Sequence, residues 1–416
     1  MEVKPRYKQT EVGIIPEEWE VKRLKQFATV KGGKRLPMGR SLSEKQTKHP
    51  YIRVADMYPG GVKLGEIKYV PEDVFPAIKN YRIHTGDLFI SVAGTLGIVG
   101  RIPVDLDGAN LTENANRITD IACDQDFLLY SLSSYRIQAS IDSVRTVGAQ
   151  PKLALGRIED FRFPLPPTEG EQRAVAAALS DTDALLHGLD RLIAKKRDLK
   201  RAAMQQLLTG ETRLPGFRGQ WEVRLLGSVG TFLKGSGVRK DESQSGELPC
   251  VRYGEIYTDH HDYIRSFSSR ISHKVAATAM PLKYGDLLFA GSGETREEIG
   301  KCVAFADRFP AYAGGDIVIL RPHDPNPIFF GYYCNTPRLN AQKARLGQGD
   351  AVVHIGAKSL AAIEIKVPEK EEQTAIATVL SDMDAEIEAL ERRRDKTRAL
   401  KQAMMQELLT GRTRLV

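Results

Sequence analysis

Apolar residues recur at helical spacing in two long stretches, one in the middle of the chain and one at its C-terminal end. In the first stretch the repeating positions step by 4, 3, 4, 3 and 4 residues, at Val175, Leu179, Thr182, Leu186, Leu189 and Ile193. In the second they follow the same alternation, at Ile376, Leu380, Met383, Ile387 and Leu390. This is the a/d spacing of a coiled-coil seam. Both seams weaken around Lys196 and Thr397, and we expect them to recover at Leu199, Ala203, Leu207 and at Leu400, Met404, Leu408.

Helix-capping residues bracket both stretches. Thr168 and Glu171 have the spacing of a capping box at the start of the first helix. The second stretch has Glu369 in place of that threonine, so we expect its start to depend on acidic residues at the helix N-terminus. Gly210 and Gly411 are suited to end the two helices. A helix of about 38 residues spans roughly 57 Å at 1.5 Å per residue.

A seam of this length has to be covered by another surface. The simplest cover is the other stretch, packed antiparallel to the first as a coiled coil. The alternative is that each helix packs on its own globular domain. Heptad spacing also leaves open whether the seams pair within one chain or between two.

The two stretches are copies of one another. Residues 171–214 recur at 372–415, a shift of 201 positions without gaps, and more than half of the aligned residues are identical. Both copies open on Glu-Gln, and both close on Leu-Leu-Thr-Gly followed, one residue later, by Thr-Arg-Leu. A repeat of about half the chain predicts two similar halves rather than a solenoid, whose periods are about 20–50 residues.

The segments before the helices are rich in glycine, proline and β-branched runs, which predicts short strands and loops. They share a faint frame. Trp19-Glu20-Val21 matches Trp221-Glu222-Val223, Lys31-Gly32-Gly33 matches Lys234-Gly235-Ser236, Tyr51-Ile52-Arg53 matches Cys250-Val251-Arg252, and Gly86-Asp87-Leu88 matches Gly285-Asp286-Leu287. The residues between these matches differ. A common scaffold with different loops is typical of domains that bind different targets.

We therefore predict an α+β protein with a pseudo-two-fold internal repeat. Two β-rich globular domains are joined by two long antiparallel helices. The expected boundaries are residues 1–168 for the first globular domain, 169–214 for the central helix and connector, 215–371 for the second domain and 372–416 for the C-terminal helix.

Composition narrows the function only slightly. The formal net charge of +7 is mildly basic and fits a nucleic-acid partner without requiring one. No apolar run reaches the roughly 20 residues of a membrane span, and the N-terminus has no signal-peptide core. We expect a soluble, cytoplasmic protein.

The sequence contains only weak candidates for chemistry. The four cysteines, Cys123, Cys250, Cys302 and Cys334, are far apart and predict neither a metal site nor a disulfide framework. Asn326-Pro327-Ile328-Phe329 reads as a turn before a buried segment, and Glu364-Ile365-Lys366 as a strand with its polar residues outward. His260-His261 has no second pair of ligands at metal spacing. We expect no catalytic residues, no metal and no cofactor.

The ordered set of motifs, occurring twice over essentially the full length, resembles the specificity subunit of type I restriction–modification systems. The motifs that carry the resemblance are Pro-x-x-x-Glu-Gln at Pro167–Gln172 and Pro368–Gln373, the two Leu-Leu-Thr-Gly ends, the two Gly-Asp-Leu triplets and Ile15–Glu20. The resemblance implies a non-catalytic subunit in which each globular domain is a target recognition domain that reads one half of a bipartite DNA site. It implies helices that set the gap between half-sites and dock two modification (methyltransferase) subunits, which restriction subunits then join. It also implies that the two chain ends lie near each other.

Basic residues at matched places are the candidates for DNA contact, because phosphates require cations and Arg suits guanine edges. They are Lys31, Lys34, Arg35, Arg40 and Arg53 in the first half, and Lys234, Arg239, Lys240, Arg252 and Arg270 in the second. A coiled-coil scaffold that binds protein or RNA without DNA sequence specificity is the alternative function. A standalone enzyme is a third, which the motif search does not favour.

Overall fold

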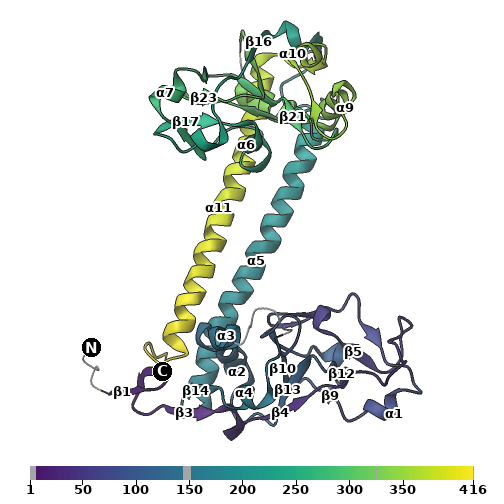
Figure 1. Ribbon diagram of the computed structural model, residues 1–416, viewed down its shortest axis with the longest axis vertical. Helices are drawn as coiled ribbons and strands as arrows, with labels where there is room; N and C mark the ends of the chain where they lie inside the picture. Colours follow the sequence, from purple (N-terminus) through teal and green to yellow (C-terminus); the bar gives the residue numbers. More distant parts are fainter. Residues whose placement is uncertain (1–5, 144–150, 325, 416) are drawn as a thin grey trace. The chain divides into compact units, whose positions relative to one another are not determined.

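The computed structural model describes residues 6–143, 151–324 and 326–415, which fold as two compact units (Figure 1). Unit 1 comprises Met1–Asp190 and Arg393–Val416, and unit 2 comprises Arg191–Arg392. Each unit therefore contains one globular domain and a segment from each of the two long helices.

The two long helices form as predicted. Helix α5 runs over Glu169–Leu207 and helix α11 over Lys370–Leu408, each 39 residues long. The Glu171 N–H donates to Thr168 Oγ1 at 3.2 Å, which is one half of the expected capping box. The Glu171 carboxylate does not complete the box as expected, because it accepts hydrogen bonds from Arg414. Gly210 and Gly411 have φ values of +74° and +68°, the left-handed conformation that favours glycine after a helix.

Within each unit the two helix segments pack antiparallel in a single chain. In unit 1 the paired residues are Thr182 with Met404 (3.7 Å), Asp183 with Lys401 (2.6 Å) and Asp190 with Arg394 (3.8 Å). In unit 2 they are Lys196 with Glu386 (2.6 Å), Arg197 with Glu391, and Lys200 with Asp384 (2.7 Å). In unit 1 the partner number on α11 falls as the number on α5 rises, and in unit 2 the partner falls from Glu386 for Lys196 to Glu372 for Arg213, which follows α5. The two seams therefore cover each other.

The predicted recovery of the seams is wrong at its first position in each helix, whereas Leu207 and Leu408 are buried as predicted. Leu199 and Leu400 are 47% and 56% exposed and do not lie in the seam. Continuing the 3–4 alternation from Ile193 gives position 200, and Lys200 faces inward to pair with Asp384. Lys401 does the same with Asp183. A charged pair therefore occupies the position where an apolar residue was expected.

The two sequence copies exchange their closing arginines. Arg213 ends the first copy and binds Glu372 at the start of the second, with Nε and Nη2 each 2.5 Å from a carboxylate oxygen. Arg414 ends the second copy and binds Glu171 at the start of the first, at 2.8 and 3.1 Å. The side chains of Glu171 and Glu372 are both 2% exposed.

The described ends of the chain meet in unit 1, as the resemblance implied. Tyr7 donates its hydroxyl to the Gly411 carbonyl at 3.1 Å, and Arg414 lies 3.0 Å from Glu18.

The globular domain of unit 1 is built on two four-stranded sheets. The first has the order β11 (Val99–Arg101), β10 (Leu88–Ser91), β13 (Ala115–Thr119) and β4 (Thr29–Gly32), and the second has the order β8 (Lys68–Tyr69), β5 (Pro50–Ile52), β12 (Ala109–Leu111) and β9 (Arg82–Ile83). Three two-stranded pairs complete the strands: β1 (Tyr7–Thr10) with β2 (Gly13–Pro16), β3 (Glu20–Arg23) with β14 (Arg162–Leu165), and β6 (Met57–Tyr58) with β7 (Gly61–Val62). The short helices are α1 (Phe75–Ile78), α2 (Gln125–Leu132), α3 (Tyr135–Asp142) and α4 (Leu155–Glu159).

Unit 2 repeats the topology of the two four-stranded sheets. Its sheets have the orders β16 (Gly230–Lys234), β24 (Ile317–Pro322), β20 (Leu287–Ala290), β22 (Cys302–Ala304), and β18 (Ser269–Ile271), β17 (Leu248–Val251), β23 (Tyr312–Ala313), β19 (Met280–Pro281). The pairs are β15 (Glu222–Leu225) with β26 (Glu364–Val367), and β21 (Ser292–Gly293) with β25 (Val353–His354). The short helices are α6 (Tyr253–Thr258), α7 (His273–Ala276), α8 (Pro327–Tyr333), α9 (Pro337–Leu346) and α10 (Ala357–Ala361). In each unit one strand pair of the second sheet is parallel, β5 with β12 and β17 with β23.

The central strands β10 and β20 are buried at every position and apolar except for Ser91, because both faces of their sheets are covered. Leu88 and Ile90 belong to one core cluster of unit 1 and Phe89 to another, as the alternation of side chains along a strand requires. In unit 2, Leu287 and Leu288 are divided in the same way. The Gly-Asp-Leu triplets begin these strands, and the Asp87 and Asp286 carboxylates accept the backbone N–H groups of residues 84 and 283, which closes a tight turn.

Strand register corrects one of the matches made from sequence. Gly33 donates to the Ala115 carbonyl at the start of β13, and Gly235 donates to Ile317 at the start of β24, so these two glycines are equivalent. A Cβ at either position would lie 2.0 Å from a backbone carbonyl oxygen of the adjacent segment, which explains why both residues are glycine. The equivalent of Lys234 is therefore Gly32, and Lys31 lies one position away, so the two lysines point to opposite faces of their sheets.

Seam burial predicts a clear contrast between two leucines of α11. Replacing the fully buried Leu380 by alanine should lower the free energy of unfolding by about 2–4 kcal/mol, because a cavity remains. The same change at exposed Leu400 should cost less than about 0.5 kcal/mol. Denaturant unfolding measures both, and equal losses would contradict the corrected seam.

The exchanged arginines predict a second stability effect. Arg414→Met leaves the Glu171 carboxylate buried without its cation and should cost about 2 kcal/mol or more. Arg392→Met is the control. Arg392 is 71% exposed, and its ion pair with partly exposed Glu388 is long, at 3.7 Å, so the change should leave the stability nearly unaltered. Denaturation midpoints that fall equally for the two variants would show that the exchange contributes nothing.

Candidate nucleic-acid interface

In unit 1 the predicted basic residues gather partly at one end of the parallel strands β5 and β12. Lys34 donates its backbone N–H to Leu111, the last residue of β12, and Arg53 directly follows β5. Tyr51 donates its hydroxyl to the Lys34 carbonyl at 2.9 Å, which ties the two strands' ends to the basic loop. Lys31 lies within β4, and Arg40 lies elsewhere, paired with Asp73.

Several of these cations have acidic or aromatic neighbours but remain largely exposed. Lys31 is 3.6 Å from Asp120, and Arg35 is 3.5 Å from Glu113 with 76% of its side chain exposed. The Lys34 ammonium lies 5.7 Å from the centre of the Tyr81 ring. Exposed ion pairs of this kind are weak, so phosphate groups can compete for the cations.

Arg53 and Arg252 are equivalent residues with a clear structural role. Arg53 Nε donates to Asp56 at 2.9 Å, and its backbone N–H donates to the same carboxylate. Arg252 donates its backbone N–H to Glu255 at 3.1 Å, three residues on. Each arginine begins a short helical turn, and the Asp56 partner raises the pKa of the Arg53 guanidinium. Both guanidinium groups are partly buried; that of Arg53 hydrogen-bonds to Asp56, and that of Arg252 lies 4.0 Å from Glu255. These contacts hold the loop that follows the parallel strand.

In unit 2 the basic loop occupies the corresponding position. Gly315 donates to the Gly237 carbonyl and Gly314 to Val251, which places the loop leading to Arg239 and Lys240 against the ends of β17 and β23. Arg239 and Lys240 are exposed. Arg270 is also exposed and donates to the Glu247 carbonyl at 3.1 Å.

Lys234 borders a hollow of about 440 Å³ that sequence reasoning did not find. Ser292 and His354 line it, and a 2.9 Å hydrogen bond joins Ser292 Oγ to His354 Nδ1. In unit 1 the equivalent backbone pair is Ala93 with Lys152. Both units therefore place a basic or imidazole side chain at this point. The two strands concerned are about 60 residues apart in sequence, so no local motif signals their meeting.

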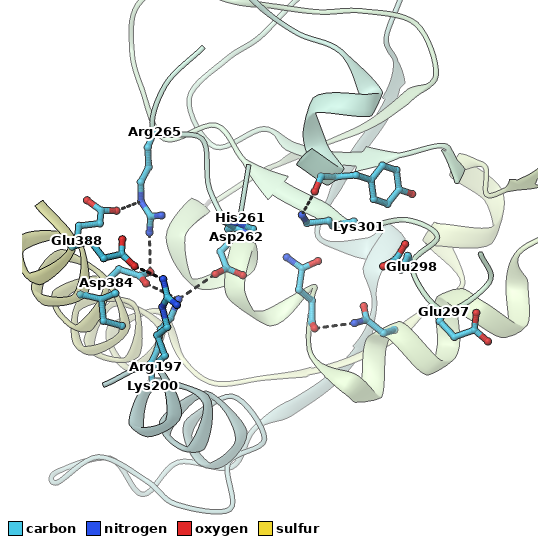
Figure 2. A pocket seen from close by; sticks show the side chains of 15 residues that line it. Arg197, Lys200, His261, Asp262, Arg265, Glu297, Glu298, Lys301, Asp384 and Glu388 are labelled. Atoms are coloured by element: carbon cyan, nitrogen blue, oxygen red, sulfur yellow. Dashed lines mark hydrogen bonds and ion pairs between the residues drawn. The ribbon is translucent and has the colours of Figure 1, made fainter. Parts of the chain in front are cut away.

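A larger cavity of about 820 Å³ lies where the globular domain of unit 2 meets its helix segments (Figure 2). Lys200 of α5 and Asp384 of α11 lie at its edge, with Asp262 and Arg265 from the loop after α6. Arg265 Nη2 is 2.8 Å from Asp384, and its Nε is 3.2 Å from Glu388. Lys200 Nζ is 3.4 Å from Asp262.

Burial changes the acid–base properties of the groups around this cavity. It raises the pKa of the Asp262 carboxyl, although Lys200 opposes the shift. It lowers the pKa of the Lys301 ammonium, which donates to the Tyr257 carbonyl at 3.2 Å. Burial also lowers the pKa of His261, which lines the cavity, and of His260, which is only 2% exposed.

The weak chemical candidates have structural roles. Asn326 caps helix α8 by accepting the Phe329 N–H at 3.1 Å, and Glu364 and Lys366 are the exposed residues of alternating strand β26. Among the described residues there is no group of three or more His, Cys, Asp or Glu side chains arranged to hold a metal ion. Across the same residues, no helix combines the length and apolarity needed to cross a membrane.

Comparison with known proteins connects this architecture to a family. The sequence model described as "Type I restriction modification DNA specificity domain" matches the chain twice, at residues 16–195 and 219–397. Two relatives from Methanocaldococcus jannaschii match nearly end to end. One, named "Putative type I restriction enzyme MjaX specificity subunit", is 25% identical, and the match covers 98% of this chain and 97% of the relative. The other, the type I restriction enzyme MjaVIII specificity subunit, is 23% identical over 96% of this chain and 94% of its own length.

A solved structure has the same fold. The type I restriction–modification system S subunit from M. genitalium aligns with a TM-score of 0.56 and 16% identity, over 97% of this chain and 98% of that one. The family model covers well over half of the chain and falls on both units. This chain therefore belongs to the type I restriction–modification DNA specificity family.

Proposed function

We propose that this chain is the DNA sequence-specificity subunit of a type I restriction–modification complex, acting in the cytoplasm. Each globular domain reads one half of a bipartite site. The observation that carries the proposal is the double match of the specificity-domain family to two units that share one topology. The two units differ in the loops that present cations, so the two half-sites differ in sequence.

The helices have two tasks in this proposal. They set the spacer between half-sites, and they dock two modification (methyltransferase) subunits, to which restriction subunits are added. Catalysis belongs to those partners, and this chain supplies sequence recognition. The similarity of the two helix copies favours equivalent docking surfaces, because equivalent partners require equivalent contacts.

The DNA-binding surface of each domain is proposed at the loops beside its parallel strand pair. Lys34 and Arg35 serve unit 1 there, and Lys234, Arg239 and Lys240 serve unit 2. Further phosphate contacts outside these loops are proposed for Lys31 within β4, Arg40 beside Asp73 and Arg270 within β18. Arg53 and Arg252 support these loops through their acidic partners. We propose the same domain boundaries as before: residues 1–168 and 215–371 for the two recognition domains, 169–214 for the central helix and connector, and 372–416 for the C-terminal helix.

The scaffold alternative accounts for the long helices alone. It gives no reason for two globular domains with a shared frame and different loops, and the named relatives are specificity subunits. Salt-dependent retention of random duplexes without any enrichment would favour it.

The proposal predicts the outcome of selection from random DNA. The chain assembled with its modification subunits should enrich a gapped, non-palindromic motif, because the two loop sets differ. Sequencing of the retained duplexes measures this. A single ungapped motif, or no enrichment, would contradict the proposal.

Individual cations should act through phosphate contacts. Lys234→Ala should weaken binding to all duplexes and reduce the slope of log K against log salt by about 0.9, the value for one lost phosphate contact. Lys366→Ala is a matched control, since Lys366 is an exposed strand lysine of the same unit outside the basic loops. Fluorescence anisotropy at several salt concentrations measures both, and equal slopes would remove Lys234 from the interface.

A further inference from the structure

Among the described residues, each unit has a place where its globular domain and both long helices meet through polar side chains. In unit 1, Tyr130 of α2 donates its hydroxyl to Asp183 of α5 at 3.0 Å. Lys401 of α11 approaches the two oxygens of the same carboxylate at 2.6 and 2.8 Å. The Lys401 ammonium also lies 5.4 Å from the centre of the Tyr130 ring. We call these three residues the unit 1 clamp.

Unit 2 contains the same arrangement with the helices exchanged. Tyr332 of α8 donates to Asp384 of α11, and Lys200 of α5 lies 2.7 Å from that carboxylate and 4.9 Å from the centre of the Tyr332 ring. These three residues form the unit 2 clamp. It is the more enclosed of the two, since Tyr332 is fully buried and the Asp384 side chain is 11% exposed.

The clamps occupy a costly position. Lys200 and Lys401 stand at seam positions of the helix pair, where leucine would pack without desolvating a charge. A buried ion pair is weak evidence for stability, because the loss of hydration offsets most of the attraction. What the ion pair adds is a fixed relative orientation of its partners, since hydrogen bonds to a charged acceptor require particular distances and angles.

Most of the surrounding contact has no preferred direction, apart from the hydrogen bond that the Asp124 N–H donates to Gln172 Oε1 at 2.8 Å near the start of α5. In unit 1 the globular domain meets the helices through Phe127, Leu165, Val175, Leu179 and Leu408, a cluster of apolar side chains. Apolar burial is not directional and tolerates small rotations. The Tyr130 hydroxyl supplies the clamp's fixed link between domain and helices. Burial and the Asp183 charge both raise the pKa of this tyrosine, so its hydroxyl stays protonated as a donor.

Unit 2 reinforces its clamp with an arm from the loop after α6. Arg265 binds Asp384 and Glu388, and Asp262 faces Lys200 across the edge of the cavity (Figure 2). The guanidinium also stacks 4.2 Å from the centre of the Tyr263 ring. The arm is part of the globular domain, so it adds contacts between that domain and both helix segments of unit 2.

We propose that the two clamps are the positioning device of the protein. They hold each recognition domain at one orientation on its helix segments and so restrict the spacing between half-sites that the chain accepts. This inference rests on the proposed function, because it assigns residues to the control of spacing.

The test compares DNA duplexes that carry the selected half-sites with the selected spacer, or with one base pair more or fewer. The chain is assembled with its modification subunits, and binding constants are measured for wild type and for the double variant Tyr130→Phe, Tyr332→Phe. Both changes keep the aromatic ring and the Lys–Asp pair and remove only the hydroxyl link. Tyr333→Phe is the matched control, because the Tyr333 hydroxyl bonds to the Lys366 backbone within the domain of unit 2.

The double variant should lose about tenfold in discrimination between the selected and altered spacers, the order expected for a lost hydrogen bond to a charged acceptor. Its affinity for the selected spacer should change by less than about twofold, and Tyr333→Phe should discriminate as wild type does. Lys200→Arg with Lys401→Arg keeps the charge pairs and should also retain discrimination. Thermal unfolding compares the folding of all variants.

Two results would overturn the positioning role. One is undiminished spacer discrimination in the double variant. The other is an equal loss of affinity at every spacer, which a merely structural hydroxyl would give. The absence of any gapped preference in the wild-type complex is a different outcome, because it contradicts the proposed function itself.

Discussion

The exchange of charged residues between the two sequence copies is the constraint on which the architecture depends. Arg213 closes the first copy but binds Glu372 of the second, and Arg414 closes the second but binds Glu171 of the first. The opening glutamate and the closing arginine of one copy lie at opposite ends of a 39-residue helix and cannot pair with each other. Each buried glutamate therefore takes its cation from the other copy. The antiparallel pairing of α5 and α11 follows, since it brings the start of one copy to the end of the other within each unit. The repeated Glu-Gln and Thr-Arg-Leu motifs are thus two halves of one contact.

A common frame supports two different recognition surfaces. Both units have the same paired sheets and the same parallel strand pair. Both also have a glycine after the edge strand of the first sheet, Gly33 after β4 and Gly235 after β16. The solvent-facing residues of the following loops differ between the units. Lys152 and His354, which occupy equivalent positions, differ as well. A frame that tolerates such changes allows each domain to acquire its own base preferences while the helix contacts stay constant. The arm at Arg265 and Asp262 shows that the attachment of a domain to its helices also differs in detail.

Much of the fold could be predicted because it is encoded locally or repeated. Helix length, the glycines that end the helices and the antiparallel pairing follow from heptad spacing and from the identity of the copies. The predicted recovery of the seam failed at Leu199 and Leu400, because the neighbouring lysines, Lys200 and Lys401, take the inward positions and pair with Asp384 and Asp183. The match of Lys31 with Lys234 failed by one residue, since a short motif with one lysine and one glycine does not fix strand register.

The candidate site was less accessible from sequence. The structural role of Arg53 and Arg252 depends on acids three residues on, which a search for cations alone overlooks. The clamps join residues about 50 positions apart and about 180 to 220 positions apart, and no local pattern signals such contacts. Hydroxyl-radical footprinting of the chain with its modification subunits on a selected duplex tests the central claim most directly. Two protected segments of different sequence with an accessible gap between them are predicted, and one continuous protected block would contradict the account.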